Sequence, residues 1–342
     1  MADKINPVDV LIIGGGPAGL SAALHLARQS HSVTIFDSGS YRNDPSAELH
    51  GVSTWDHQHP VDFRNKSREE LGQFPNVRIV DIEVQKVAKI NEQLFCIQAE
   101  NDKFWIGKKV LLATGSQEIF PEIDGYNECW GRRIFHCLFA DNYKVRKSAA
   151  AGVLAVKPCG NLSMALYLAQ KAAQFSAEVI IYTHGDQQLA TQLEAALAEA
   201  ALQTGGNNDA NQQTSKLFKV VSDPVDGIVT VYDADGNPIA LELYFVDRTE
   251  EIAFMLHNPI VVLRGTFAAQ LGVEVAPGPF PGTGNISISA PSLQTNVRGV
   301  FAAGDCMANP KTIPNAMATG CNAAIGISAQ LLAEKHHHGP LF

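Results

Sequence analysis

Three glycines with the spacing Gly14-x-Gly16-x-x-Gly19 stand between a buried-strand pattern and a helical pattern. In such a unit Gly14 permits a tight turn, Gly16 lets the backbone approach a pyrophosphate, and Gly19 lets the helix pack on the sheet. Pro17 and Ala18 open the helix, whose positive N-terminal end attracts an anion. The spacing therefore predicts a loop that binds the pyrophosphate of a dinucleotide.

An acidic residue stands where such a loop requires one. Asp37 ends the next strand pattern, about twenty residues beyond the loop, and Ser38 follows it. A carboxylate at this place accepts hydrogen bonds from an adenosine ribose. Glycine-rich turns are common, so the loop alone is weak evidence, but strand, helix, second strand and terminal acid occur together here. We therefore expect nucleotide binding.

The cysteines restrict a second kind of chemistry. No two of them form a C-x-x-C pair, and six scattered cysteines do not make a disulfide scaffold. They are Cys96, Cys129, Cys137, Cys159, Cys306 and Cys321. The chain also has no G-x-S-x-G elbow, no H-E-x-x-H motif and no metal-ligand spacing, so we predict no metal site.

Composition excludes several classes of protein. The 342 residues suggest about two domains, and 46% hydrophobic with 18% charged residues excludes a disordered chain. A net charge of −9 without basic runs gives no footprint for nucleic acid. The uncharged stretch 10–27 has a glycine-rich centre, which fits a strand and a helix better than a membrane span. We expect no nucleic-acid or membrane partner and, without a signal sequence or paired cysteines, a cytoplasmic location.

Apolar patterns place these residues on two βαβ units, over residues 8–36 and 152–182. Residues 76–90 and 94–99 alternate apolar and polar positions and predict antiparallel strands. A hairpin turning at Asp235-Gly236 is expected in the second half. The predicted fold class is α/β, with two Rossmann-like, doubly wound, three-layer dinucleotide-binding domains.

The second βαβ unit interrupts the first domain. We assign residues 1–117 and 248–342 to one discontinuous domain and residues 118–247 to the inserted domain. Residues 204–215 are low in hydrophobicity and predict a mobile loop.

Two further stretches carry a resemblance to a known family. Ala113-Thr114-Gly115 follows a buried strand, and residues 299–305 (Gly-Val-Phe-Ala-Ala-Gly-Asp) precede a last helix over about residues 315–332. With the first loop, they resemble the FAD signatures of two-dinucleotide-domain flavoproteins. In that superfamily the acid matching Asp305 holds the flavin ribityl chain, and the helix that begins near Ile313 points its positive end at the pyrimidine ring.

Over almost its whole length the chain resembles low-molecular-weight thioredoxin reductases, and within them the fungal gliotoxin-type sulfhydryl (dithiol) oxidases. The stretches that carry this are Tyr41-Arg42-Asn43, residues 55–60 (Trp-Asp-His-Gln-His-Pro), residues 130–139 and Lys311-Thr312. That family binds FAD, is typically homodimeric, and oxidises thiols of small secondary metabolites with molecular oxygen. The resemblance implies FAD contacts at Gly14, Gly16, Pro17, Ala18, Gly19, Asp37, Ser38, Arg42, Asn43, Val84, Ala113, Thr114, Gly115, Gly304, Asp305, Thr312 and Ile313.

The chain departs from this family at the redox motif. Where the family has C-x-x-C-H, this chain has Cys137 followed by Ala140 and Asp141. Both thiols are needed to form a disulfide and pass electrons to the flavin, so we interpret Cys137 as a remnant. Asp141 could be a general base if burial raises its pKa, or an ordinary surface acid. The resemblance also places His57 and His59 on a loop near the flavin, with a solvated loop as the alternative. Cys137, Asp141 and His57 are the candidate catalytic residues.

A second departure lies at residues 156–163 (Val-Lys-Pro-Cys-Gly-Asn-Leu-Ser), where a reductase has a second glycine loop for NADPH. Only Gly160 remains, and Pro158 restricts the backbone. We therefore expect the inserted domain to be a degenerate NAD(P)H-binding domain.

These patterns support one leading hypothesis and two alternatives. The first is an FAD-dependent oxidase that takes electrons directly from a small secondary metabolite and passes them to O2. The second is a thiol or dithiol oxidase that uses Cys137 or the substrate's own dithiol. The third is a non-redox catalyst or binding module with structural FAD. We expect a homodimer in each case, from the resemblance alone.

Overall fold

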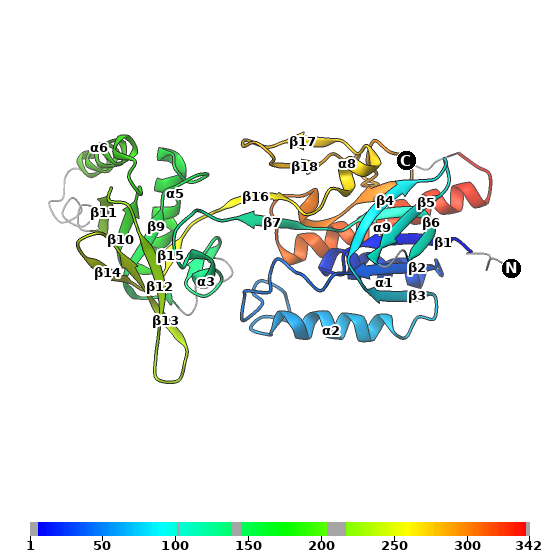
Figure 1. Ribbon diagram of the computed structural model, residues 1–342, viewed down its shortest axis with the longest axis horizontal. Coiled ribbons are helices and arrows are strands. Elements are labelled where there is room, and N and C mark those ends of the chain that lie inside the picture. The colour runs from blue at the N-terminus through cyan, green and yellow to red at the C-terminus, as the bar shows by residue number, and fades with distance from the viewer. Residues whose placement is uncertain (1–5, 101–102, 139–144, 204–216, 340–342) are drawn as a thin grey trace. The chain divides into compact units, whose positions relative to one another are not determined.

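The chain folds into two units (Figure 1). The structure is a computed structural model that describes residues 6–100, 103–138, 145–203 and 217–339. Unit 1 contains residues 1–44, 51–117 and 261–342, and unit 2 contains residues 45–50 and 118–260. The chain passes between them along β7 (Ser116–Ile119) and β16 (Ile260–Leu263), which pair as a two-stranded sheet. One unit is thus inserted in the other, with the return at residue 261 instead of 248.

A seven-stranded sheet forms the centre of unit 1, in the order β3-β2-β1-β6-β5-β4 with β19 also paired to β6. Neighbours among β1, β2, β3, β6 and β19 pair in parallel, whereas β4 and β5 extend the sheet in antiparallel pairs. The strands are β1 (Val8–Ile13), β2 (Val33–Asp37), β3 (Val77–Asp81), β4 (Val84–Lys89), β5 (Phe95–Ala99), β6 (Phe104–Leu112) and β19 (Val300–Ala302).

The antiparallel prediction for residues 76–90 is correct only for their second half. β3 pairs in parallel with β2, and the chain leaves it at Ile82, whose N–H donates to the carbonyl of Asp37 at 2.9 Å. Alternation of apolar and polar residues shows that a strand is half-buried, but it carries no information about the direction of its neighbour.

Helices cover one face of this sheet. Because successive side chains of a strand point to opposite faces, each central strand contributes to two cores. Val10 and Ile12 of β1 pack with α1 (Pro17–Arg28) and α9 (Ile313–Lys335). Leu11 and Ile13 pack into the core that β4 and β5 share on the other face. The remaining elements of unit 1 are α2 (Pro60–Leu71), α8 (Phe267–Leu271), β17 (Val275–Pro277), β18 (Gly284–Ile286) and the short 3-10 helix η3 (Gly304–Cys306).

Helix α9 is long and apolar enough to cross a membrane by length and composition alone. In unit 1, 56% of that apolar stretch is buried, and α9 packs closely on α1. A Cβ added at Gly320 would stand 2.2 Å from the carbonyl oxygen of Ala18. The hydropathy of α9 is therefore explained by its place in the core.

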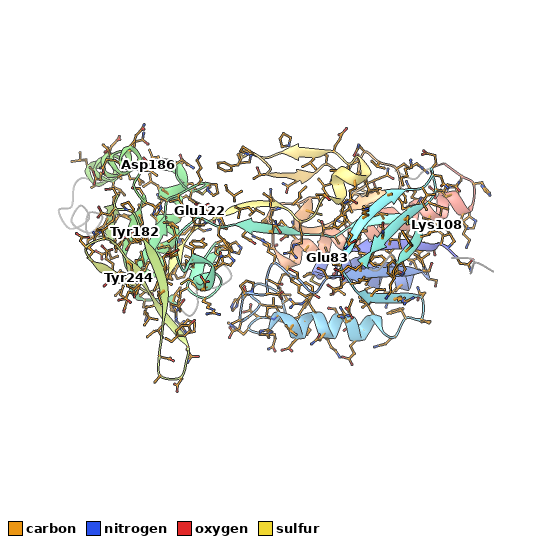
Figure 2. All side chains as sticks on the ribbon, viewed as in Figure 1. Glu83, Lys108, Glu122, Tyr182, Asp186 and Tyr244 are labelled. Atoms are coloured by element: carbon orange, nitrogen blue, oxygen red, sulfur yellow. The ribbon has the colours of Figure 1, made fainter. Side chains whose placement is uncertain are left out.

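Unit 2 has a parallel sheet between two layers. The strand order is β11-β10-β9-β15-β8, and Val153 and Ile181 face α5 and α6 while Leu154 and Ile180 face a three-stranded antiparallel sheet. Figure 2 shows Tyr182 inside this unit at the end of β10 and Asp186 just before α6. The elements are α3 (Tyr126–Cys129), β8 (Ile134–Phe135), β9 (Ser148–Leu154), α5 (Leu162–Ala172), β10 (Ser176–Tyr182), α6 (Gln187–Gln203), β11 (Phe218–Val221), β12 (Gly227–Tyr232), β13 (Pro238–Tyr244), β14 (Thr249–Ile252) and β15 (Met255–Leu256).

The late return to unit 1 follows from two short strands. β14 pairs with β13, and β15 fits between β9 and β8. Strands this short show too little periodicity to be separated from those of unit 1 by sequence. The predicted hairpin at Asp235-Gly236 is confirmed, with β12 and β13 antiparallel around it. The predicted loop at 204–215 lies outside the described residues.

Replacing Gly320 by alanine should destabilise unit 1 by about 2–4 kcal/mol, because its Cβ would meet the backbone of Ala18 and not a movable side chain. Urea unfolding measures this, with Asn322→Ala on the exposed side of α9 as the control. Equal stability of the two variants would show that α1 and α9 are not in backbone contact.

Candidate functional site

Four loops of unit 1 meet at one edge of its sheet, because the carboxyl ends of parallel strands lie at the same edge. Gly14 follows β1, Asp37 ends β2, Ala113 follows β6 and Ala303 follows β19. β1 pairs with β2 and β6, and β6 pairs with β19, so the four ends are neighbours. Motifs far apart in the sequence are thereby brought together.

The glycine loop connects β1 to α1 through two backbone contacts. Gly14 has a φ of 116°, and a Cβ there would stand 2.2 Å from the carbonyl oxygen of Ala113. A Cβ at Gly19 would stand 2.0 Å from the carbonyl oxygen of Gly14. Gly16, the N-cap of α1, differs: no atom of the described residues lies within 4 Å of its Cβ position, and no side chain caps the helix there. The loop therefore offers an open, positively polarised helix end.

Asp37 lies directly behind this loop. Its Oδ2 accepts hydrogen bonds from the Tyr41 hydroxyl at 2.6 Å and from the Arg68 guanidinium at 2.8 Å, and its Oδ1 accepts one from the Gly39 amide at 3.1 Å. A Cβ at Gly15 would stand 2.1 Å from Oδ2, so only glycine fits beside the carboxylate. Burial and the hydrogen bond to Asp37 raise the pKa of Tyr41, which keeps its proton as the donor.

Two arginines that were not predicted from the sequence hold Tyr41 and Asp37 in place. Arg64 and Arg68 lie one turn apart on α2. The buried Arg64 guanidinium lies 3.8 Å from the Tyr41 ring centroid and pairs with Asp44 at 2.7 Å. Arg64 also donates to Asn43 Oδ1 at 3.2 Å. The signal was present as two arginines at i and i+4 after a predicted loop, but such pairs are usually solvated.

The loop after β19 carries the second acid. Asp305 Oδ2 accepts from the Arg42 guanidinium at 3.2 Å, and both side chains are largely buried. Thr312 is the N-cap of α9, and its hydroxyl oxygen accepts from the Asn315 amide at 3.3 Å. Helix α9 begins at Ile313, so its positive end follows directly.

The other residues of the predicted cofactor set lie around these loops. Gly304 has a φ of 79°, and its Cβ position lies 2.9 Å from the Ala18 side chain. Gly115 has a φ of 71° and ends the Ala113-Thr114-Gly115 stretch. Val84 begins β4 and is buried, whereas Ser38 is exposed.

The two loop histidines have different environments. His59 is the N-cap of α2, where its Nδ1 accepts from the Val61 amide at 3.2 Å. His57 has a φ of 64°, is about half exposed, and lies 3.2 Å from Asp56. His57 belongs to unit 1, whereas Cys137 belongs to unit 2.

Cys137 follows β8 and is half-buried. The preceding ring of His136 stacks on Trp130 at 5.6 Å between centroids, and Trp130 stacks on Tyr126 at 6.1 Å. The Tyr126 hydroxyl is 2.6 Å from His257 Nδ1. This aromatic ladder anchors the chain that leads into Cys137. Phe139, Ala140 and Asp141 lie outside the described residues.

The loop that replaces the second glycine motif is closed by its own side chains. Cys159 is fully buried, where its thiol accepts from the Asn258 amide at 3.3 Å and donates to the Asn258 carbonyl at 3.5 Å. Burial raises the pKa of Cys159 to about 11, so it is a thiol and not a thiolate. Asn161 caps α5 by accepting from the Met164 amide at 3.0 Å. The helix end that would face a pyrophosphate thus has a partner from its own chain.

His257, which follows β15, is a buried titratable group of unit 2. Its side chain is inaccessible, and burial lowers the pKa of His257 to about 4. The neutral ring accepts from Tyr126 at Nδ1 in the tautomer that leaves the proton on Nε2, and this hydrogen bond ties β15 to α3. This pair could not be predicted from the sequence, because the two residues are distant in the chain.

All six cysteines are free. Cys306 is fully buried beside Asp305 and hydrogen-bonds the carbonyls of Ala303 and Leu112 at 3.2 and 3.3 Å. Burial raises the pKa of Cys306 to about 11, which suits a small core residue and not a redox thiol.

Comparison with known proteins gives consistent matches over nearly the whole chain. Residues 8–320 match the family described as pyridine nucleotide-disulphide oxidoreductase. The chain is 37% identical to thioredoxin reductase tcpT of Claviceps purpurea over 98% of each protein. It is 34% identical to thioredoxin reductase sirT of Leptosphaeria maculans over 97% of each.

Solved structures have the same architecture. HlmI superposes with a TM-score of 0.78 at 26% identity, covering 97% of this chain and 94% of that one. An oxidoreductase from Agrobacterium tumefaciens superposes with a TM-score of 0.79 at 24% identity, covering 96% and 99%. At 24% identity, the likeness to the Agrobacterium tumefaciens oxidoreductase shows the fold alone. Both agree with the α/β fold class predicted from the two βαβ units.

The burial of neutral His257 predicts acid sensitivity. Its folded-state pKa of about 4 lies below the ordinary value of 6.5, so the unfolded chain binds more protons between these values. The free energy of unfolding should therefore fall as the pH is lowered from 6.5 towards 4, by at most about 1.4 kcal/mol per pH unit from this group. Urea unfolding at a series of pH values should give a smaller slope for His257→Gln than for wild type. The exposed His336→Gln variant should keep the wild-type slope, and equal slopes for all three would contradict the assignment.

Proposed function

Because the chain belongs to the pyridine nucleotide-disulphide oxidoreductase family, as a thioredoxin reductase-like member, we propose that it is an FAD-dependent oxidase of a small secondary metabolite. The family typically binds FAD. In this proposal the electrons pass directly from the substrate to the flavin and then to O2, without a redox dithiol. The working form is a homodimer, as the resemblance to this family suggests.

The residues of unit 1 fit FAD. Among the residues that the structure describes, no side chain caps the N-terminal end of α1 and no atom lies near a Cβ at Gly16, which suits an approaching pyrophosphate. The buried Asp37 carboxylate suits the adenosine ribose. Asp305 and Arg42 supply hydrogen-bonding groups for the rest of the cofactor, and the N-terminal end of α9 is positively polarised.

When bound, FAD supplies two-electron chemistry: it accepts a hydride equivalent from the substrate and passes two electrons to O2, which takes up two protons and leaves as hydrogen peroxide. The chain's own part is to bind and orient. Tyr41 and Arg68 hold the Asp37 carboxylate in place by hydrogen bonds, at the position where the adenosine ribose would bind. The close packing of the Gly304 loop on Ala18 keeps Asp305 at a constant distance from the glycine loop.

The observation that carries the proposal is alanine at position 140, the place of the second thiol in the family's C-x-x-C-H motif. Without the second thiol, Cys137 has no resolving partner within the motif, and a disulfide relay to the flavin cannot operate. The loop at Cys159–Asn161 is closed by contacts of its own side chains. This weakens the case for NADPH as the reductant of the flavin. A direct donor and O2 then complete the electron balance.

One observation favours a second candidate, a thiol or dithiol oxidase. Cys137 is half-buried and follows His136, whose ring stacks on Trp130, so it remains a positioned thiol. A mixed disulfide with Cys137 would require a second thiol from the substrate to release it and an acceptor for two electrons. The flavin would be that acceptor.

The test begins with anaerobic mixing of the purified flavoprotein with hydride donors of three kinds: phenols, alcohols and dihydro-aromatic compounds. A dithiol and NADPH are mixed in parallel. The proposal expects bleaching of the flavin absorbance by one of the three kinds of donor and slow or no bleaching by NADPH. Bleaching by NADPH alone would make the protein a reductase and refute the proposal.

Cys137→Ser separates the two candidates. Oxygen consumption with the reducing substrate should stay within about twofold of wild type, as for a residue that makes no contact in the transition state. Cys96→Ser, on β5 and half-buried, is the matched control for loss of a thiol. Loss of activity in Cys137→Ser with a normal control would favour the thiol oxidase. Turnover without flavin reduction or oxygen consumption would indicate a non-redox protein.

A further inference from the structure

One arginine contacts two of the loops at the cofactor edge of unit 1. Arg264 directly follows β16, the strand that pairs with β7. Its backbone amide donates to the carbonyl of Gly115 at 3.5 Å, in the loop after β6. Its guanidinium donates to the backbone carbonyl of Ser40 and, at 3.3 Å, to the Ser40 hydroxyl, in the loop after β2. A single residue therefore connects the ends of two strands that are not neighbours in the sheet.

The strand order shows where this connection lies. β1 stands between β2 and β6, so the glycine loop after β1 lies between the two loops that Arg264 joins. Helix α1 begins directly after Gly16 of that glycine loop. Arg264 therefore reaches along the sheet edge at the place where the pyrophosphate and the adenosine of a dinucleotide would bind.

The loop after β2 is the part of this edge that most needs support. Ser38, Gly39 and Ser40 are all exposed, and Gly39 has a φ of 72°. A segment with few buried apolar contacts opens readily unless polar contacts hold it. On one side the Gly39 amide and the Tyr41 hydroxyl bind the Asp37 carboxylate. On the other side Arg264 holds Ser40 from a distant part of the chain.

We propose that Arg264 is a positioning residue for the adenosine half of FAD, and that it acts by holding residues 38–41 beside the glycine loop. This inference rests on the proposed function, because it requires FAD in unit 1. A loop that is already fixed loses little conformational entropy when the cofactor binds, so the cofactor is bound more tightly. The effect falls on the adenosine half, because Ser40 stands three residues after Asp37, the acid suited to the adenosine ribose.

The experiment measures how fast the purified holoenzyme releases FAD. An added phosphodiesterase cleaves released FAD to the more fluorescent FMN, so the rise in fluorescence follows release. Arg264→Met removes the guanidinium and keeps an unbranched side chain. A hydrogen bond from a charged group changes an equilibrium constant by roughly ten- to a hundredfold, and the lower figure applies because Ser40 is exposed. Release should therefore be about tenfold faster than from the wild type.

Three further variants make the result specific. Arg264→Lys keeps a charged donor and should bring the rate back to within about threefold of wild type. Arg298→Met removes a half-exposed arginine that pairs with Glu334 and should leave the rate unchanged. Arg264→Ala should give the faster release even if the methionine variant folds poorly.

A second readout distinguishes positioning of the adenosine half from a general loss of stability. Rebinding of added FAD is measured with ADP or FMN as the competitor. ADP should compete about tenfold less well in Arg264→Met than in wild type, whereas FMN should compete equally in both. Equal weakening of the two competitors, or an unchanged release rate in both the methionine and the alanine variant, would overturn the inference.

The outcomes separate this inference from the function on which it rests. An unchanged release rate would overturn the role of Arg264 and leave the oxidase proposal standing. Bleaching of the flavin by NADPH alone would refute the oxidase proposal, while faster release from Arg264→Met would still support the role of Arg264. A wild-type protein purified without flavin and unable to bind added FAD would overturn both.

Discussion

The site depends on one constraint, the close packing of backbone around the first turn of α1. The Cβ position of Gly320 on α9 lies 2.2 Å from the carbonyl oxygen of Ala18, and that of Gly304 lies 2.9 Å from the Ala18 side chain. Within the loop itself, the Cβ position of Gly19 lies 2.0 Å from the carbonyl of Gly14. Because each contact leaves no room for a side chain, the starts of α1 and α9 and the loop after β19 are held at one edge of the sheet. The positive N-terminal ends of α1 and α9 and the acids Asp37 and Asp305 thus lie at the same edge of the sheet.

In unit 2 the same βαβ architecture carries a loop before α5 that is held by contacts within the chain. The core between β9, β10 and α5 includes Val153, Ile181 and Leu168, and the loop contributes Cys159 to it. The loop is held by hydrogen bonds from the Asn258 amide to Cys159 and from the Met164 amide to Asn161. A fold of this kind supports several chemistries, and the residues at the strand ends decide among them. The family assignment therefore fixes the scaffold more firmly than the reaction.

Much of unit 1 could be predicted because its determinants are local. The strand, the three glycines and the helix lie in one stretch of sequence, and Asp37 ends the very next strand. What could not be predicted depends on contacts between distant segments. Arg68 reaches Asp37 from α2, and Tyr126 meets His257, which lies 131 positions later in the sequence. Periodicity reports which face of an element is buried, but it does not report which partner lies opposite.

The alanine at position 140 supports the proposal that the flavin is the sole redox centre. A reductive titration of the purified protein with dithionite under anaerobic conditions tests this most directly. If the flavin is the sole redox centre, two electrons per flavin complete the reduction. Consumption of four electrons per flavin would reveal a disulfide in communication with the cofactor, and would contradict it.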